Sequence, residues 1–117
     1  MKPYIHSKIN SKRHGGVPED YMDINEFFDW SKIAYPNMKH RAILHNSFGI
    51  YLCEKVFGRT RTNSEGKVYS VRDIAEEHIQ DDLGFIPTIQ DWLEKLELSK
   101  PWMRGEKPRK IVYKRED

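Results

Sequence analysis

Two histidines and one aspartate occupy positions that helical spacing turns toward apolar neighbours. In residues 71–83 the apolar residues recur at about 100° per residue, and His78 and Asp82 fall within that face, one turn apart. Residues 38–57 have a comparable apolar face that contains His45. Leaving a buried imidazole or carboxylate unpaired costs about 1–3 kcal/mol, so these groups require partners. His45, His78 and Asp82 are therefore our candidate catalytic residues.

Three interpretations of these residues remain open. The first is a buried hydrogen-bond network that only stabilises the fold. The second is a metal site formed by His45, His78 and Asp82, because three such ligands and an open position suit a catalytic zinc or manganese ion. The third is a metal-free site with histidine as acid or base and with Arg41 or Arg72 holding an anion. The spacing matches no stringent motif such as H-E-x-x-H.

The N-terminal segment could bind phosphate. His6, Lys12 and Arg13 precede a Gly-Gly pair, and flexible glycine backbone beside basic side chains can cradle an anion. No Walker spacing is present, so a solvated arm is the plainer interpretation. These three residues join Arg41 and Arg72 as candidate ligand-binding residues.

Local signals predict a mainly α-helical, single compact domain with about four helices and one short β-hairpin. Capping residues, Gly58 and Gly84 mark several helix ends. We divide the chain into a basic, irregular N-terminal arm (1–22), a helical core (23–98) and a basic tail (99–117). We expect helices at about 23–34, 38–57 and 71–83 and from Thr88 onward, a hairpin at 59–70 and a short edge strand at 110–113.

Composition is typical of a soluble domain. The chain has 117 residues, of which 14 are aromatic, enough for one core without staples. Cys53 is the only cysteine, which excludes an internal disulfide and a cysteine-based zinc site within one chain, and we interpret it as a core residue. The sequence has neither a signal peptide nor an apolar run of about 18 residues, so we expect no membrane partner and a cytoplasmic location.

Charge is unevenly distributed, since both ends are basic and residues 17–98 carry an acidic excess. The ends could lie against the acidic centre or stay solvated, and they could also meet phosphate or nucleic acid. The acidic centre and the absence of a recognised motif argue against sequence-specific DNA binding.

Several runs of residues carry a resemblance that extends from His6 to Met103. They are INEFFDWSK, KHRAILHNSFGIYL, TNSEGKVYSVRDIAEEHI and IPTIQDWL. The chain resembles a family of uncharacterised bacteriophage and prophage proteins of about 110–120 residues, with an HRAxxHxxxG helix and a VRxIxExHxxxDLGxIP segment. This resemblance implies a phage-type accessory protein that works in the host cytoplasm. The family often has a second histidine where this chain has Asn46, which argues against a scheme that needs two adjacent imidazoles.

The residues and the resemblance together predict recognition of a phosphate-bearing small molecule. A nucleotide is the expected ligand, and sequestering or cleaving a host immune signal is the expected role. A metal-dependent phosphohydrolase that uses a divalent metal is the first alternative. A nucleic-acid- or protein-binding module is the second. We also expect a homo-oligomer, because a chain of this size often completes a ligand pocket across a subunit interface.

Overall fold

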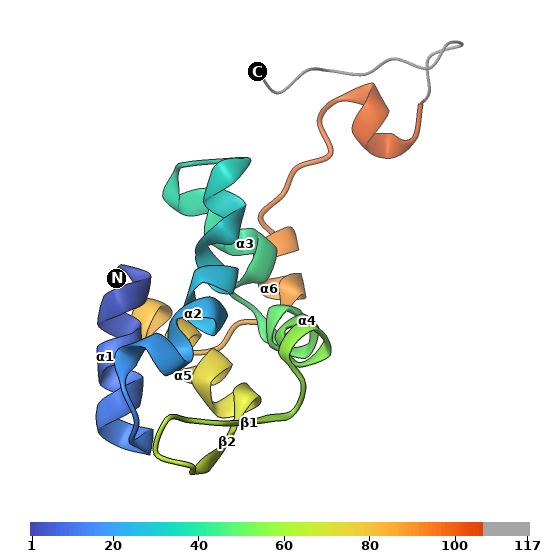
Figure 1. Cartoon of the computed structure of the whole chain (residues 1–117). Coiled ribbons are helices and arrows are strands. Elements are labelled where there is room, and N and C mark those ends of the chain that lie inside the picture. The colour runs from blue at the N-terminus through green and yellow to red at the C-terminus, as the bar shows by residue number, and fades with distance from the viewer. Residues whose placement is uncertain (107–117) are drawn as a thin grey trace.

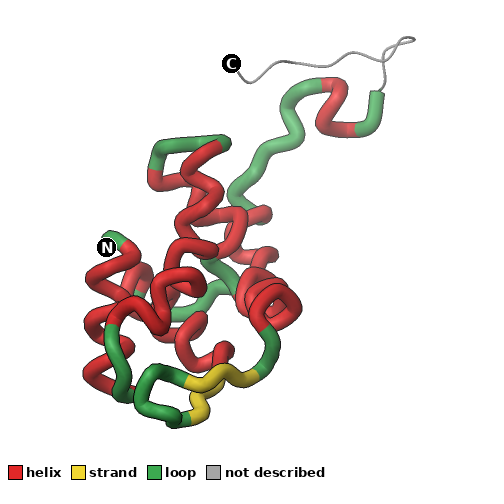
Figure 2. The backbone as a smooth tube through the Cα atoms, in the orientation of Figure 1, coloured by secondary structure: helices red, strands yellow, loops and turns green. Residues whose placement is uncertain are grey.

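The computed structural model describes residues 1–106, which form helices and one two-stranded sheet. The predicted mainly helical domain with a single short hairpin is confirmed, and Figures 1 and 2 show its arrangement. The helices of these residues are α1 (Pro3–His14), η1 (Pro18–Tyr21), α2 (Met22–Asp29), η2 (Trp30–Ile33), η3 (Met38–His40), α3 (Arg41–Leu44), α4 (Ser47–Phe57), α5 (Val71–Leu83), α6 (Ile89–Leu93) and η4 (Pro101–Arg104), where η denotes a 3-10 helix. The strands are β1 (Thr60–Thr62) and β2 (Val68–Ser70).

The core lies where α2, α4 and α5 meet. Ile24 and Phe28 of α2 pack with Ile74 and Ile79 of α5, and all four side chains are fully buried. Burial of an aliphatic or aromatic side chain stabilises the fold by about 1.5–3 kcal/mol. This contact fixes the rotation of α2 and α5 about their axes, and so decides where their polar side chains point.

The bounds predicted for the helix at 71–83 are confirmed. Ser70 caps its first turn, since the Ser70 hydroxyl accepts a hydrogen bond from the backbone N–H of Asp73 at 3.3 Å. Gly84 ends the helix with a φ of 82°, and its N–H donates to the carbonyl of Gln80. Ile74, Ala75, His78 and Ile79 are buried, so the predicted inward face is also correct.

The predicted irregular N-terminal arm is wrong, because residues 3–14 form the helix α1. Pro3 stands at the start, where its missing N–H costs nothing, and the basic last turn complements the helix dipole. The residues that α1 buries are polar, namely His6, Ser7 and Asn10. No apolar stripe marked the helix in the sequence, which explains the error.

The single helix predicted at 38–57 is also wrong, because the backbone breaks at His45 and Asn46. Asn46 has extended backbone, and its side-chain oxygen accepts a hydrogen bond from the N–H of Gly49 at 2.8 Å, which starts α4. The new helix then packs against the carbonyl of Leu44. A Cβ atom on Gly49 would lie 1.8 Å from that oxygen, so the close approach requires glycine.

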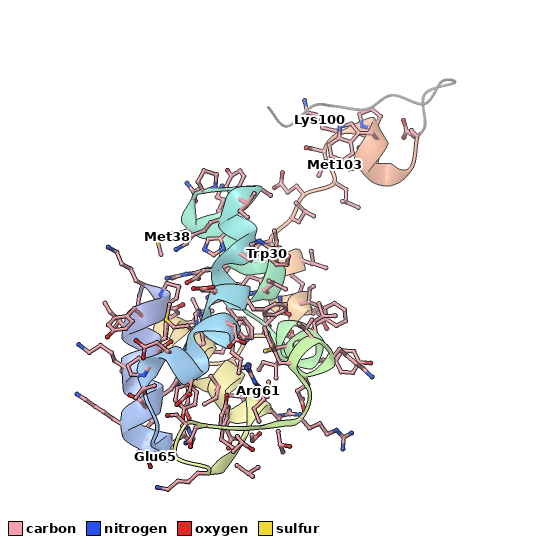
Figure 3. The ribbon with its side chains drawn as sticks, in the orientation of Figure 1. Trp30, Met38, Arg61, Glu65, Lys100 and Met103 are labelled. Carbon is pink, nitrogen blue, oxygen red and sulfur yellow. The ribbon has the colours of Figure 1, made fainter. Side chains whose placement is uncertain are left out.

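The hairpin and the C-terminal elements complete the described chain. β1 and β2 pair antiparallel as predicted, and Arg61 of β1 reaches Asp23 of α2 at 2.8 Å. Figure 3 labels Arg61 beside the hairpin, and Lys100 and Met103 on the segment that leads away from the helices.

α6 begins after its predicted Thr88 cap but spans only five residues. The expected strand at 110–113 lies outside the described residues. Nowhere in residues 1–106 is a helix long and apolar enough to cross a membrane.

Candidate metal centre

Four side chains from three segments of the chain converge at the inner face of α5. Asp29 is the last residue of α2, and His45 stands at the break between α3 and α4. His78 and Asp82 lie one turn apart on α5. One nitrogen or oxygen atom from each of the four side chains lies within 4.8 Å of those of the other three. We call these residues, Asp29, His45, His78 and Asp82, the four-residue centre.

Asp82 lies at the middle of these contacts. Its Oδ2 is 2.9 Å from Nε2 of His45 and 3.3 Å from Nε2 of His78. Its Oδ1 is 3.1 Å from Nε2 of His6 and 3.0 Å from the amino group of Met1. Asp29 Oδ1 completes the centre at 3.7 Å from Nε2 of His78 and 4.0 Å from Nε2 of His45.

These separations suit a small divalent cation. Ligand atoms about 2.1 Å from a tetrahedral ion lie roughly 3.4 Å from one another, which falls within the observed 2.9–4.0 Å between histidine and aspartate atoms. Two imidazoles and two carboxylates match the preferences of zinc and manganese. His78 supplies an independent sign, because its Nε2 is buried, faces both carboxylates and makes no hydrogen bond in the described structure.

Burial and charge perturb the acid–base properties of the centre. Burial alone would raise the pKa of Asp82, but its hydrogen bonds with His45 and His6 and the nearby ring of His78 hold that pKa well below the usual aspartate value. Burial lowers the pKa of His45, and this outweighs the effect of Asp82. Burial acts in the same direction on His78, but its pKa is raised because Asp29 and Asp82 favour the protonated ring. In this structure a positive charge between the carboxylates is therefore favourable, and a proton or a metal ion can supply it.

The centre approaches the surface at Asp29 and Arg41. The side chains of His45 and His78 are fully buried and that of Asp82 is 1% exposed, whereas those of Asp29 and Arg41 are 9% and 17% exposed. Nη2 of Arg41 lies 3.7 Å from Oδ1 of Asp82. A guanidinium at this edge is placed to meet an anion that approaches the centre.

A comparison with family models matches most of the chain. A model described as a domain of unknown function, DUF6915, matches residues 1–103. The chain belongs to the DUF6915 family. All four residues of the centre and the whole of α1 lie within the matched part of this DUF6915 chain. No curated protein and no solved structure matches it significantly.

The structure separates the candidate residues into two groups. His45, His78 and Asp82 lie together, with His6 and Arg41 beside them. The other three candidates do not reach the centre. Arg13 pairs with Glu77 and Asp81, Arg72 pairs with Glu54 and Glu76, and Lys12 is exposed.

Asp29 is the member of the centre that sequence reasoning missed. A signal was available, because Ile24, Asn25, Phe28 and Asp29 are spaced as two adjacent rows on one face of α2, and all four are buried. Two polar residues beside an apolar stripe are the pattern that identified His78 and Asp82. Cys53 stays a core residue, since burial raises the pKa of its thiol to about 12 and so suppresses nucleophilic thiolate.

Proposed function

We propose that this DUF6915 chain is a divalent-metal-dependent hydrolase that acts on a small phosphate-bearing molecule. The convergence of Asp29, His45, His78 and Asp82 carries the proposal. A purely structural network would be expected to pair its buried polar atoms with one another. Here Nε2 of His78 and Oδ2 of Asp29 lack hydrogen-bond partners among the described residues.

The chemistry follows from the ligand set and from Arg41. A zinc or manganese ion held by the centre would acidify a water molecule and polarise a phosphoryl oxygen, provided that its coordination number exceeds four or that one of the four side chains leaves a position open. Water would add to phosphorus, the bond from phosphorus to the leaving oxygen would break, and that oxygen would take up a proton. Arg41 would hold the phosphate at the exposed edge of the centre, where its guanidinium is 3.7 Å from Asp82.

The narrow exposure of the centre favours a small substrate. The centre is covered except at narrow edges beside Asp29, Arg41 and Met1, which suits the phosphate of a nucleotide better than the backbone of a long polymer. Our preferred ligand is a nucleotide. The proposal also includes a phage setting, a role against host immune signalling, a cytoplasmic location and a homo-oligomeric state.

Metal content is the first measurement. Purified wild type should contain or take up close to one zinc or manganese ion per chain, as measured by elemental analysis and calorimetry. Asp82→Asn should lose that capacity, because an amide is a poor ligand for a divalent ion. Asp81→Asn is the matched control, since Asp81 is the neighbouring residue on α5 and pairs with Arg13 instead of joining the centre.

Hydrolysis is the second measurement. Phosphate release from a panel of nucleoside mono-, tri- and cyclic phosphates should require the metal, stop with a chelator and be absent in Asp82→Asn. Arg41→Ala should raise KM for the best substrate, whereas Arg72→Ala on the exposed face of α5 should not. If folded Asp82→Asn binds metal and hydrolyses as wild type does, the hydrolase proposal fails. If wild type binds no metal, the centre is a buried structural network.

A further inference from the structure

His78 differs from the other two histidines around Asp82 in what its second ring nitrogen meets. Nδ1 of His78 lies 2.9 Å from Oδ1 of Asn25, deep in the protein. Nδ1 of His6 and Nδ1 of His45 are buried and lack a hydrogen-bond partner among residues 1–106. Because an amide oxygen only accepts, the contact with Asn25 requires a proton on Nδ1 of His78.

The orientation of the Asn25 amide is itself determined by its neighbours. Nδ2 of Asn25 donates to the backbone carbonyl of Tyr21 at 3.2 Å and to Oδ1 of Asn10 at 2.7 Å. It also lies 2.9 Å from the hydroxyl of Ser7. A flipped amide would place the Asn25 oxygen against the Tyr21 carbonyl, where neither atom can donate. The oxygen of Asn25 must therefore face His78.

The order of donors and acceptors continues outward to a carboxylate. Nδ2 of Asn10 donates to Oε1 of Glu77 at 2.8 Å, which leaves Oδ1 of Asn10 to accept from Asn25. An ionised carboxylate only accepts, so Glu77 fixes the orientation of Asn10. The other carboxylate oxygen, Oε2, lies 2.6 Å from Nε2 of His14. We call Glu77, Asn10 and Asn25 the orienting chain.

We infer that Asn25 is a positioning residue for His78. Held by Asn10 and Glu77, it keeps the proton on Nδ1 and so directs the lone pair of Nε2 into the four-residue centre, toward Asp29 and Asp82. Without this constraint the two carboxylates would draw the proton of the neutral ring to Nε2, where it would block a metal ion. The metal part of this inference rests on the proposed function, whereas the position of the proton does not.

The position of the proton can be measured without metal. Nitrogen-15 NMR of the imidazole rings distinguishes a nitrogen that carries a proton from one that does not. In metal-free wild type, at a pH where the ring of His78 is neutral, Nδ1 should be the protonated nitrogen and Nε2 the bare one. A neutral ring protonated mainly on Nε2 overturns the inference.

Variants of the orienting chain test whether Asn25 is the cause. Asn25→Leu removes the acceptor, so the proton should move to Nε2 and zinc affinity should fall about 10- to 100-fold, as for other partners of metal-bound histidines. Asn25→Asp keeps an acceptor and should keep the proton on Nδ1. Glu77→Ala should lower zinc affinity less than Asn25→Leu, because Tyr21 still orients the amide. Glu76→Ala, one residue away on the outer face of α5, should leave the zinc affinity unchanged.

These measurements separate the inference from the proposed function. If wild type binds no zinc but protonates His78 on Nδ1, the hydrolase proposal fails and the role of Asn25 in setting the proton stands. If wild type binds zinc but the metal-free ring is protonated on Nε2, the role of Asn25 fails. If folded Asn25→Leu binds zinc with wild-type affinity, the role of Asn25 fails as well. If that variant does not fold, the wild-type spectrum and the zinc affinity of Glu77→Ala test the role of Asn25 instead.

Discussion

Among the single residues, Asp82 is a buried carboxylate surrounded by basic groups. Its two oxygens approach three imidazoles, the amino group of Met1 and the guanidinium of Arg41. A carboxylate with a strongly lowered pKa and a 1% exposed side chain belongs to the kind of environment in which functional residues cluster. The same contacts make the centre sensitive to charges placed next to it.

The lowered pKa of His40 leads to a prediction of how the stability of the metal-free protein depends on pH. Burial lowers the pKa of His40, the charges of Asp29 and Asp82 oppose this, and those of Lys32 and Arg41 add to it, with a net lowering. The unfolded chain therefore takes up the His40 proton first, at about pH 6.5. The free energy of unfolding should therefore decrease as the pH falls below about 6.5, and this decrease should end below the pKa of His40 in the folded protein.

Replacing His40 checks this sign. His40→Gln should flatten the decline in unfolding free energy below pH 6.5, by at most about 1.4 kcal/mol per pH unit, since only one titrating group is removed. Urea unfolding of both proteins at several pH values, with metal excluded, makes the comparison. A steeper decline in the variant would contradict the assignment.

Gly49 gives a prediction about packing. Gly49→Ala should destabilise the protein by about 1–3 kcal/mol or more, because the new methyl group would overlap the carbonyl of Leu44. Lys55→Ala, at an exposed position of the same helix, should change stability by about 0.5 kcal/mol or less. Chemical denaturation measures both. Equal stabilities would mean that the break at His45 and Asn46 can relax.

At the scale of elements, α1 is held to the body by polar contacts. His6 meets Asp82, Asn10 and His14 meet Glu77, and the residues that α1 buries are all polar. A helix attached in this way depends on charge more than on apolar area. Since α1 also supplies His6 and Asn10, its docking and the organisation of the centre are coupled.

Charge reversal on α1 tests this coupling. Arg13→Glu would place a carboxylate beside Glu77 and Asp81, so the melting temperature should fall and amide exchange in α1 should accelerate. Lys12→Glu should change neither, because surface changes away from such contacts usually stay within about 0.5 kcal/mol. If both variants behave alike, net charge and not the pairing of Arg13 controls the docking of α1.

At the scale of the whole molecule, metal binding should stabilise the fold, because the ligands come from α2, the α3–α4 break and α5. Zinc at 100 times its dissociation constant should add about 2.7 kcal/mol, which corresponds to roughly 10–20 °C in melting temperature for a domain of about 100 residues. Calorimetric scans with and without zinc measure the shift. Folded His78→Asn and Asp82→Asn should show no shift, whereas Asp81→Asn should shift like wild type.

Local sequence patterns were sufficient for the elements whose stability is local. Ser70 and Gly84 delimit α5, residues 63–66 form the turn of the hairpin, and Thr88 caps α6. In each case the signal and the structure it produces lie within a few residues. The inward position of His78 and Asp82 was predictable for the same reason, since it depends only on the helical repeat and on neighbouring apolar residues.

Packing between separate elements accounts for the features that local sequence patterns did not predict. α1 buries a polar face, so its helical nature produces no apolar periodicity. The break at His45 and Asn46 depends on Gly49 packing against the Leu44 carbonyl. Asp29 and Asn25 join the site because α2 packs on α5 in one particular rotation, which brings their side chains to His78. Helical periodicity is enough to predict which polar side chains face inward on α5, whereas their partners depend on how separate helices pack against one another.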